Sequence, residues 1–361
     1  MAHVCDAGSS AGFGEAGSAM PRDITGEAAD PIGLAPVDEV EITILVDNSY
    51  DGLLPDAAMA RRTGLRDSPA VTAPGFEGGA SFAGLVAEHG FSALMTVTRG
   101  GRSHTLLFDT GISAGGLATN IERLGIDAGS FESVVLSHGH FDHTGGLTGL
   151  ARLRGRSGLP LIVHPLVWSR RRIVVPATPA APAWERPSIS STALEAEGFQ
   201  IVERRWPSLL LDGCVLVTGE VDRTTDFEHG MPNHEVLGDN GWEPDPQVFD
   251  DQAVVVNVRG RGLVVVTGCG HAGAVNIARH AMRLTGVDRL DALIGGFHLS
   301  GPAFAPVIEP TAAALADMAP SLVVPAHCTG WQAQQRLASR LADGVFVLNA
   351  VGTVYTITAA G

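Results

Sequence analysis

The chain of 361 residues contains no lysine, so its 24 basic side chains, histidine aside, are arginines. This absence excludes a Walker-type phosphate-binding lysine, a Schiff-base lysine and a pyridoxal phosphate site in this chain. Acidic side chains outnumber basic ones by 39 to 24, which gives a formal net charge of -15. Nucleic-acid binding depends on clustered arginine and lysine, so we expect no nucleic-acid partner.

Cysteine and long apolar runs are also scarce. The four cysteines, Cys5, Cys214, Cys269 and Cys328, are too scattered for a disulfide framework and form no C-x-x-C pair. No stretch approaches the ~18–20 uninterrupted apolar residues of a membrane span. Residues 1–38 are rich in glycine, alanine, serine and acidic side chains and lack the apolar core of a signal peptide, which indicates a disordered leader. We therefore expect a cytoplasmic protein with no membrane partner, whose oligomeric state the sequence leaves open.

Short β-branched runs alternate with helical patterns along residues 39–361, which we interpret as one domain. Strands are predicted at residues 41–47, 91–98, 105–109, 134–136, 161–164, 215–218, 253–258, 263–267, 292–295, 322–325, 345–348 and 353–357. Helical spacing is found at residues 117–124, 272–284, 311–318 and 332–341. Several neighbouring strands are joined by short turns, which favours two sheets with helices outside both. Segments near 61–80 and 170–191, rich in proline, arginine, serine and alanine, are predicted to be loop insertions.

A dense cluster of metal-binding residue types follows the apolar run 134–136. His138, His140, Asp142 and His143 lie within six consecutive positions. A strand that ends in a loop can direct consecutive side chains to one point, so His138 and His140 can share one metal. Asp142 and His143 then reach a second metal beside it. Imidazole nitrogen and carboxylate oxygen suit zinc, and also manganese or iron. We therefore expect two divalent metal ions, with zinc favoured.

The string His138-Gly139-His140-Phe141-Asp142-His143 resembles the HxHxDH signature of the metallo-β-lactamase superfamily. Other segments resemble one branch of it, which is named after a dihydropterin-linked ribofuranosylaminobenzene-phosphate synthase; they lie at residues 44–48, 87–92, 107–111, 250–253, 267–273, 295–299 and 325–330. The resemblance covers about residues 41–357. It implies an α/β fold of four layers, the αββα sandwich, with metals at one edge between the two sheets.

The resemblance also bears on Cys269, which follows the buried run 263–267. In most hydrolases of the superfamily an aspartate that bridges both metals stands at this position. Thiolate is a good zinc ligand but a poor bridge between hard cations, so a symmetric two-metal site is in doubt. Cys269 is therefore either a ligand or a small buried side chain beside the metal.

The other ligands come from later in the chain. His271 is predicted to be the third ligand of the first site, with His229 and His234 as fallbacks. His327 matches the superfamily's last histidine and is expected to complete the second site together with Asp142 and His143.

Several further residues are candidates for supporting or catalytic roles. Asp109 ends a predicted strand, where its carboxylate could accept the free ring N–H of a metal-bound histidine, and Asp47 and Asp251 are weaker candidates for the same role. His298 follows a strand and two glycines and could bind metal, donate a proton to a leaving group or hold a substrate phosphate. We select Asp142 and His298 as the catalytic candidates. Arg223 matches a family position and is the candidate phosphate clamp, although a solvated arginine is an equal alternative.

This inventory predicts a hydrolase in which a metal-activated hydroxide attacks a small anionic phosphoester or ester. Three alternatives remain. The branch name implies a ribosyl-phosphate transferase, in which water is not the nucleophile. The superfamily also includes iron oxygen-dependent enzymes, so a monoiron dioxygenase is possible. A closed coordination shell that includes Cys269 would instead favour a non-catalytic metal-dependent binding protein.

Overall fold

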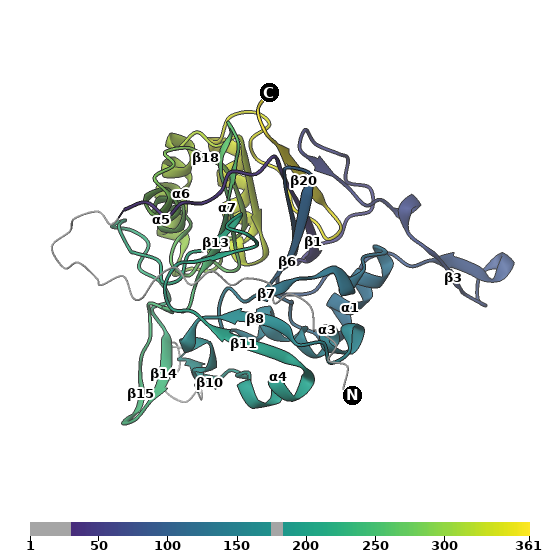
Figure 1. Ribbon diagram of the computed structural model, residues 1–361, viewed down its shortest axis with the longest axis horizontal. Coiled ribbons are helices and arrows are strands. Elements are labelled where there is room, and N and C mark those ends of the chain that lie inside the picture. The colour runs from purple at the N-terminus through teal and green to yellow at the C-terminus, as the bar shows by residue number, and fades with distance from the viewer. Residues whose placement is uncertain (1–29, 175–182) are drawn as a thin grey trace, which may run out of the picture.

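The computed structural model describes residues 30–174 and 183–361, which form two sheets packed against each other (Figure 1). In spatial order, the larger sheet consists of β11 (Phe199–Glu203), β8 (Leu159–Val163), β7 (Ser133–Val135), β6 (Arg102–Phe108), β5 (Ser92–Arg99), β1 (Glu39–Val46), β20 (Val354–Thr358) and β2 (Ala60–Arg61). The second sheet consists of β12 (Ser208–Leu210), β13 (Val215–Val217), β16 (Ala253–Val258), β17 (Gly262–Thr267), β18 (Leu290–Gly296) and β19 (Leu322–Ala326).

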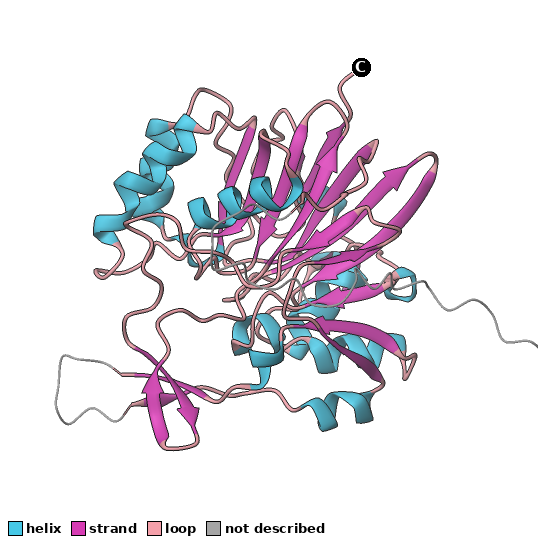
Figure 2. Ribbon diagram, turned by 60° about the vertical axis from the view of Figure 1, so that its left-hand side comes forward, coloured by secondary structure: helices cyan, strands magenta, loops and turns pink. Residues whose placement is uncertain are grey.

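Helices cover the outer face of each sheet (Figure 2). The larger sheet is covered by α1 (Ala114–Arg123), α3 (Leu147–Arg154) and α4 (Ser191–Glu197). The second sheet is covered by α5 (Ala274–Thr285), α6 (Ala305–Asp317) and α7 (Trp331–Arg340). The order is therefore helix, sheet, sheet, helix, and the predicted αββα sandwich is confirmed.

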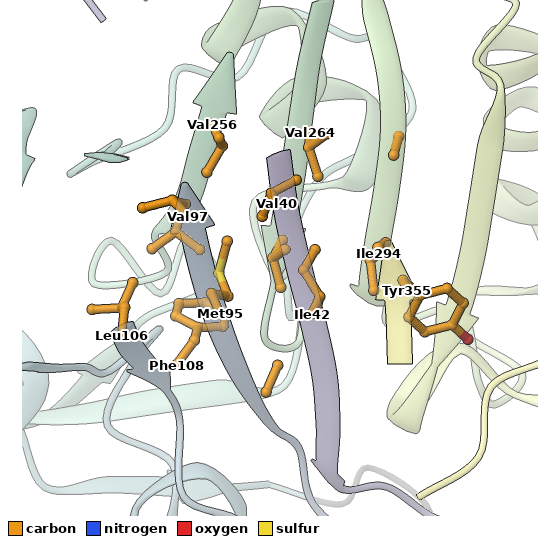
Figure 3. Close-up of a cluster of buried hydrophobic side chains, with 14 of the residues drawn as sticks. Val40, Ile42, Met95, Val97, Leu106, Phe108, Val256, Val264, Ile294 and Tyr355 are labelled. Carbon is orange, nitrogen blue, oxygen red and sulfur yellow. The ribbon is translucent and has the colours of Figure 1, made fainter. Parts of the chain in front are cut away.

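The core lies between the two sheets and continues beneath both helical layers. In β17, Val264 and Val266 point into the space between the sheets, whereas Leu263 and Val265 pack under the helices. Figure 3 shows the central cluster, in which Ile42 and Met95 of the larger sheet lie close to side chains of the second. Both faces of β17 are covered, which explains why its residues 263–266 form a continuous apolar run with no alternation. Each fully buried valine or leucine contributes about 1.5–3 kcal/mol to folding.

Strand direction determines where the loops that follow the strands gather. β6 and β7 run parallel, as do β17, β18 and β19. The carboxyl ends of parallel strands meet at one edge of a sheet, and ligands of such sheets bind outside these ends. The segments after these five strands therefore form one rim of the sandwich, and they contain the candidate ligands.

A third, smaller sheet projects from the body (Figure 2). Its strands are β10 (Trp184–Glu185), β9 (Arg171–Ile173), β14 (His234–Gly238) and β15 (Gly241–Pro244). The sequence predicted a loop insertion at residues 170–191, but β9 and β10 pair within it on either side of residues 175–182, which lie outside the described residues. We refer to these four strands as the inserted sheet.

Other sequence expectations differ from the structure in detail. The segment near 61–80 contains a projecting hairpin, β3 (Ala70–Thr72) with β4 (Ala80–Phe82), visible in Figure 1. The strand predicted at 345–348 is wrong, because Phe346 forms only an isolated bridge to Val323.

The predicted leader 1–38 lies mostly outside the described residues, but its last part packs against the domain. The backbone N–H of Ile32 donates to Leu284, and Val37 forms a bridge with Val258. Among the helices of the described residues, none is long and apolar enough to cross a bilayer.

Candidate metal centre

Three buried imidazoles converge at the rim of the sandwich. His138 and His140 follow β7, and His271 follows β17. The Nε2 atom of His138 lies 2.8 Å from Nδ1 of His140, and Nε2 of His271 lies 3.2 and 3.1 Å from these two atoms. Three ligands around one tetrahedral zinc ion are about 3.3 Å apart, from the usual zinc–nitrogen distance of about 2.0–2.1 Å. The three nitrogens are thus spaced as the ligands of one small cation.

The three rings are held in the form that binds metals. Burial lowers the pKa of His138, His140 and His271 well below the usual value, and repulsion between neighbouring imidazoles lowers it further. These histidines are therefore neutral at physiological pH, and neutral imidazole is the ligating form.

A second cluster lies beside the first. Asp142 and His143 belong to the short helix α2 (Phe141–Thr144), and His327 opens the 3-10 turn η5 (His327–Thr329) after β19. Oδ2 of Asp142 is 3.3 Å from Nε2 of His327 and 3.9 Å from Nε2 of His143. The Sγ atom of Cys269 is 3.1 Å from Nε2 of His143. One oxygen, two nitrogens and one sulfur thus lie within 4.8 Å of one another.

The donor atoms of this second cluster also fit a divalent cation. Nε2 of His327 is buried and has no hydrogen-bond partner. Burial opposes ionisation of Asp142, but His143 and His327 outweigh it and lower the pKa of that carboxyl, so it is anionic. Burial raises the pKa of the Cys269 thiol, so a thiolate forms there only beside a cation. Nitrogen, oxygen and sulfur donors together favour zinc over magnesium or calcium.

Asp109 positions ligands of both clusters. It follows β6, and its Oδ2 accepts a hydrogen bond from Nδ1 of His143 at 2.7 Å and another from the Ser137 hydroxyl at 2.7 Å. Because that hydroxyl donates to Asp109, it is left to accept from Nδ1–H of His138, 2.8 Å away. Both histidines therefore present an Nε2 lone pair to the site. A Cβ at Gly268 would lie 2.1 Å from the Ser137 Oγ, so this network needs glycine there.

His327 is positioned by two neighbouring residues that follow β1. Oδ1 of Asp47 accepts a hydrogen bond from the backbone N–H of His327 at 2.8 Å. The ring is oriented by Asn48, whose Oδ1 lies 3.1 Å from Nδ1 of His327. The sequence pointed to Asp47, but Asp47 holds the backbone while Asn48 holds the ring. Asn48 carries no charge and was not found from the sequence.

Two adjacent aspartates before β16 hold the loops that carry the ligands. Oδ2 of Asp251 accepts from the backbone N–H of Ala272 at 2.7 Å, next to His271, and burial raises the pKa of Asp251 to about 7. Oδ2 of Asp250 accepts from the backbone N–H of Gly139 at 2.8 Å, inside the histidine motif. Asp251 was predicted to support a ligand; Asp250 was not, although it lies in the same matched segment.

Three of the seven non-glycine residues with positive φ in the described part of the chain lie at this rim. Asp109, His298 and His327 have positive φ values of 58°, 43° and 47°. Residues other than glycine seldom adopt this left-handed conformation, and where they do it is often at functional sites. Each of the three follows directly or closely after a strand of the two sheets.

His298 stands between two cavities. A cavity of about 320 Å³ is lined by members of both clusters together with Asn48, His89 and Arg186. A more apolar cavity of about 200 Å³, lined in part by Met231, Phe297 and Phe304, shares His271 and His298 with the first. The His298 ring centroid lies 4.5 Å from that of His271, and its Nδ1 has no hydrogen-bond partner. His298 can thus reach a molecule bound in either cavity.

The structure places three further predicted or overlooked residues. Arg223, the predicted phosphate clamp, donates from Nη1 to the backbone oxygen of His271 at 2.9 Å and from Nη2 to that of Gln247. It is absent from the lining of the 320 Å³ cavity, and its phosphate role stays a prediction. His89, overlooked in the sequence, has its Nε2 3.5 Å from Oδ2 of Asp142. Arg186, also overlooked, lines the cavity.

The fallback ligands lie outside the two clusters. His229 lines the apolar cavity. The His234 ring stacks edge-on against His140 with centroids 5.0 Å apart. His271 occupies the place for which both were alternatives, although its assignment as a ligand, like that of the other candidates, remains a prediction.

A serine-nucleophile motif also has to be considered, because the string Gly111-Ile112-Ser113-Ala114-Gly115 has the form G-x-S-x-G. Ser113 caps helix α1, and its hydroxyl donates to Glu88 at 2.5 Å while accepting from the backbone N–H of Gly116. The serine is thus engaged in helix capping and has no histidine among these partners, unlike the serine of a hydrolase triad.

Comparison with known proteins agrees with this geometry. The model of a family described as the metallo-beta-lactamase superfamily matches residues 90–167, which include the histidine motif. A protein of Methanocaldococcus jannaschii named 7,8-dihydropterin-6-methyl-4-(beta-D-ribofuranosyl)-aminobenzene-5'-phosphate synthase is 28% identical over 256 residues, which cover 68% of this chain and 83% of that protein. An uncharacterised protein of the same organism is 28% identical over 279 residues, covering 75% of this chain and 94% of its own length.

A solved structure shares the fold. The crystal structure of Tm1679, described as a metal-dependent hydrolase of the beta-lactamase superfamily, superposes with a TM-score of 0.63 at 24% sequence identity, covering 89% of this chain and all of that one. The predicted resemblance to the superfamily and to its synthase-like branch is confirmed.

Proposed function

We propose that this chain, which is similar to proteins of the metallo-β-lactamase superfamily, is a metal-dependent hydrolase of a small anionic phosphoester or ester. The observation that carries the proposal is that residues of both ligand clusters line the same 320 Å³ cavity. A cavity of this size accommodates a small molecule. A polymer substrate would need a longer groove.

The ligands are proposed to be His138, His140 and His271 for one ion, and Asp142, His143, Cys269 and His327 for the other. Zinc is the favoured metal, with manganese or iron as alternatives. When bound, the ions would lower the pKa of a water molecule to near neutrality and polarise the substrate oxygen.

The protein's own residues then have separate tasks. Asp109 and Asn48 fix the orientation of His143 and His327, so these rings do not have to reorganise during the reaction. Asp142 presents a carboxylate to the cavity and can hold a proton taken from the attacking water. His298, with an unpartnered Nδ1 and a position between the two cavities, can donate a proton to the leaving group.

The test is hydrolysis of a panel of aryl phosphomonoesters, phosphodiesters and carboxylic esters by protein that has been stripped with a chelator and then reloaded with zinc or manganese. We expect turnover that disappears on stripping, returns on reloading and falls by at least about a hundredfold in His138→Ala. His104→Ala is the matched control, because His104 pairs with Glu132 away from the cavity. Absence of metal-dependent turnover across the panel would contradict the proposal.

A second candidate function, group transfer, is favoured by the apolar cavity that adjoins the first. A relative is named as a synthase, and two adjoining cavities can hold a donor and an acceptor together. Product release measured with and without an aromatic acceptor separates the two functions. A hydrolase releases product in the absence of the acceptor, whereas a transferase requires it.

A further inference from the structure

The inserted sheet carries four arginines, three of which have carboxylate partners. Arg170 pairs with Glu185, Arg171 with Asp250 and Asp245, and Arg172 with Glu235; the N···O distances of these pairs lie between 2.5 and 2.8 Å. The fourth is Arg186, just after β10. Within residues 30–174 and 183–361 it forms no ion pair. Its guanidinium carbon lies over the Trp184 ring, 5.5 Å from the ring centroid, and its Nε is buried without a hydrogen-bond partner.

The Arg186 side chain faces the metal centre. It lines the 320 Å³ cavity together with ligands of both clusters. His140 and His271 of the first cluster are among these lining residues. The backbone of Arg186 is fixed, because its N–H donates to the oxygen of Arg171 at 2.9 Å. Arg171 in turn is held by Asp250 beneath the histidine motif.

A guanidinium that has no carboxylate partner is unfavourable in this position unless a ligand compensates its charge. Burial lowers the pKa of Arg186, which means that its charge is partly removed from water. Buried charges in proteins are normally paired or bound to a ligand. Asp142 lines the same cavity, but its carboxylate already faces His327 and His89. The five N–H donors of arginine form a planar fork that matches phosphate and carboxylate oxygens.

A second unpartnered group lies close by. His234, from β14 of the same sheet, is buried, and neither ring nitrogen has a hydrogen-bond partner. The His234 ring centroid lies 5.0 Å from that of His140 and 6.2 Å from that of His271. Arg186 and His234 thus each bring buried nitrogens without hydrogen-bond partners to the neighbourhood of the metal centre.

We propose that Arg186 forms an anion subsite that binds a phosphate group of the substrate opposite the two metal ligand clusters. The proposal rests on the proposed function only in identifying the anion as part of the substrate. The inserted sheet then has a functional role, because the pairing of β9 with β10 positions the Arg186 guanidinium at the cavity. It also assigns phosphate binding to Arg186 and not to Arg223, because Arg223 does not line the 320 Å³ cavity and its two terminal nitrogens donate to backbone oxygens.

The test uses methylphosphonate, which resembles a phosphate monoester and cannot be hydrolysed at its P–C bond under these conditions. Its binding to the metal-loaded protein is measured by titration calorimetry for wild type, Arg186→Gln, Arg186→Lys and Arg170→Gln. Arg170 is the matched control, because it lies on the same sheet but is exposed and paired with Glu185. Metal content is measured for each variant to show that the clusters are intact.

We expect Arg186→Gln to weaken methylphosphonate binding by about tenfold to a hundredfold, Arg186→Lys to weaken it less, and Arg170→Gln to leave it unchanged. Acetate, titrated in parallel, should bind more weakly than methylphosphonate to the wild type. Binding of methylphosphonate by Arg186→Gln within twofold of wild type would overturn the proposal, since the metals alone would then bind the anion; so would tighter binding of acetate. This binding test does not depend on turnover. If the wild type hydrolyses no ester but Arg186→Gln weakens anion binding, the anion subsite is supported and the proposed hydrolase function is not.

Discussion

The buried carboxylate of Asp109 accepts a hydrogen bond from Nδ1 of His143 at 2.7 Å, and neither side chain is exposed to solvent. Burial lowers the pKa of His143, but the charge of Asp109 outweighs this effect and raises that pKa to about 9 in the absence of a cation. The same pair fixes Nε2 of His143 toward Cys269 and Asp142. Asp109 thus sets the geometry of the second cluster without itself facing the cavity.

The first prediction concerns this pair. Asp109→Asn keeps the size of the side chain and tolerates the positive φ of 58°, but it removes the charge that orients His143. Loss of such a partner typically lowers metal affinity about 10–100-fold. We expect the larger loss of zinc affinity at the second cluster, where Asp109 contacts His143 directly, and a smaller loss at the first, where it acts on His138 through Ser137. Zinc titration of the stripped protein measures both. Asp127→Asn, at a surface turn, is the control; equal affinities in Asp109→Asn and wild type would refute the assigned role.

The second prediction concerns the ion pair that joins the inserted sheet to the motif loop. Arg171 and Asp250 are buried, with N–O distances of 2.6 and 3.1 Å. Removing one partner leaves an uncompensated buried charge, so Asp250→Ala should lower the free energy of unfolding by about 3–5 kcal/mol. Urea denaturation measures it. Breaking the exposed pair Arg170–Glu185 by Arg170→Gln should cost at most about 1 kcal/mol, and a similar loss in both variants would contradict the distinction.

The third prediction concerns acid stability and His280 of α5. Burial, followed by the neighbouring Arg283, lowers the pKa of His280 to about 4. Between pH 6.5 and 4 the unfolded chain therefore binds more protons at this position than the folded one. The stability is fully present above pH 6.5 and is lost as the pH falls toward 4. His280→Gln removes this term, so the drop in unfolding free energy from pH 7 to pH 5 should be smaller in the variant by about 1–2 kcal/mol. If the unfolding free energy of wild type and of His280→Gln depends on pH in the same way, this role of His280 is excluded.

The fourth prediction concerns the apolar cavity. The Phe304 ring centroid lies 4.8 Å from that of His298, at the side of the cavity that adjoins the metal centre. If the organic part of the substrate enters there, Phe304→Ala should raise KM for aryl phosphoesters by about three- to tenfold through lost apolar contact. KM for the corresponding methyl esters should not change. An equal effect on both classes would indicate a structural role for Phe304.

Much of the site could be predicted from the sequence because its parts are local. His138, His140, Asp142 and His143 are consecutive or nearly so, and a strand end suffices to bring them together. His271 and His327 could be placed because each follows an apolar run, and the parallel arrangement of β17, β18 and β19 brings those ends to one edge.

Other features depend on tertiary contacts that leave no local pattern. Asn48 and Arg186 are ordinary polar residues in the sequence, and only the packing of β1 and of the inserted sheet brings them to the metal centre. The run 345–348 shows the reverse error. Val345, Phe346 and Val347 pack against the core while Leu348 is exposed, and the backbone has no strand partner beyond the bridge at Phe346. An apolar run was therefore mistaken for a strand.

The measurement that tests the central claim most directly is the metal content of the purified protein by elemental analysis, compared with His271→Ala and Cys269→Ala. The account predicts close to two zinc or manganese ions per chain in the wild type. It further predicts that His271→Ala loses one ion from the first cluster, and that Cys269→Ala weakens the second. About one iron per chain, lost in either variant, would contradict the binuclear hydrolase and point to oxygen-dependent chemistry.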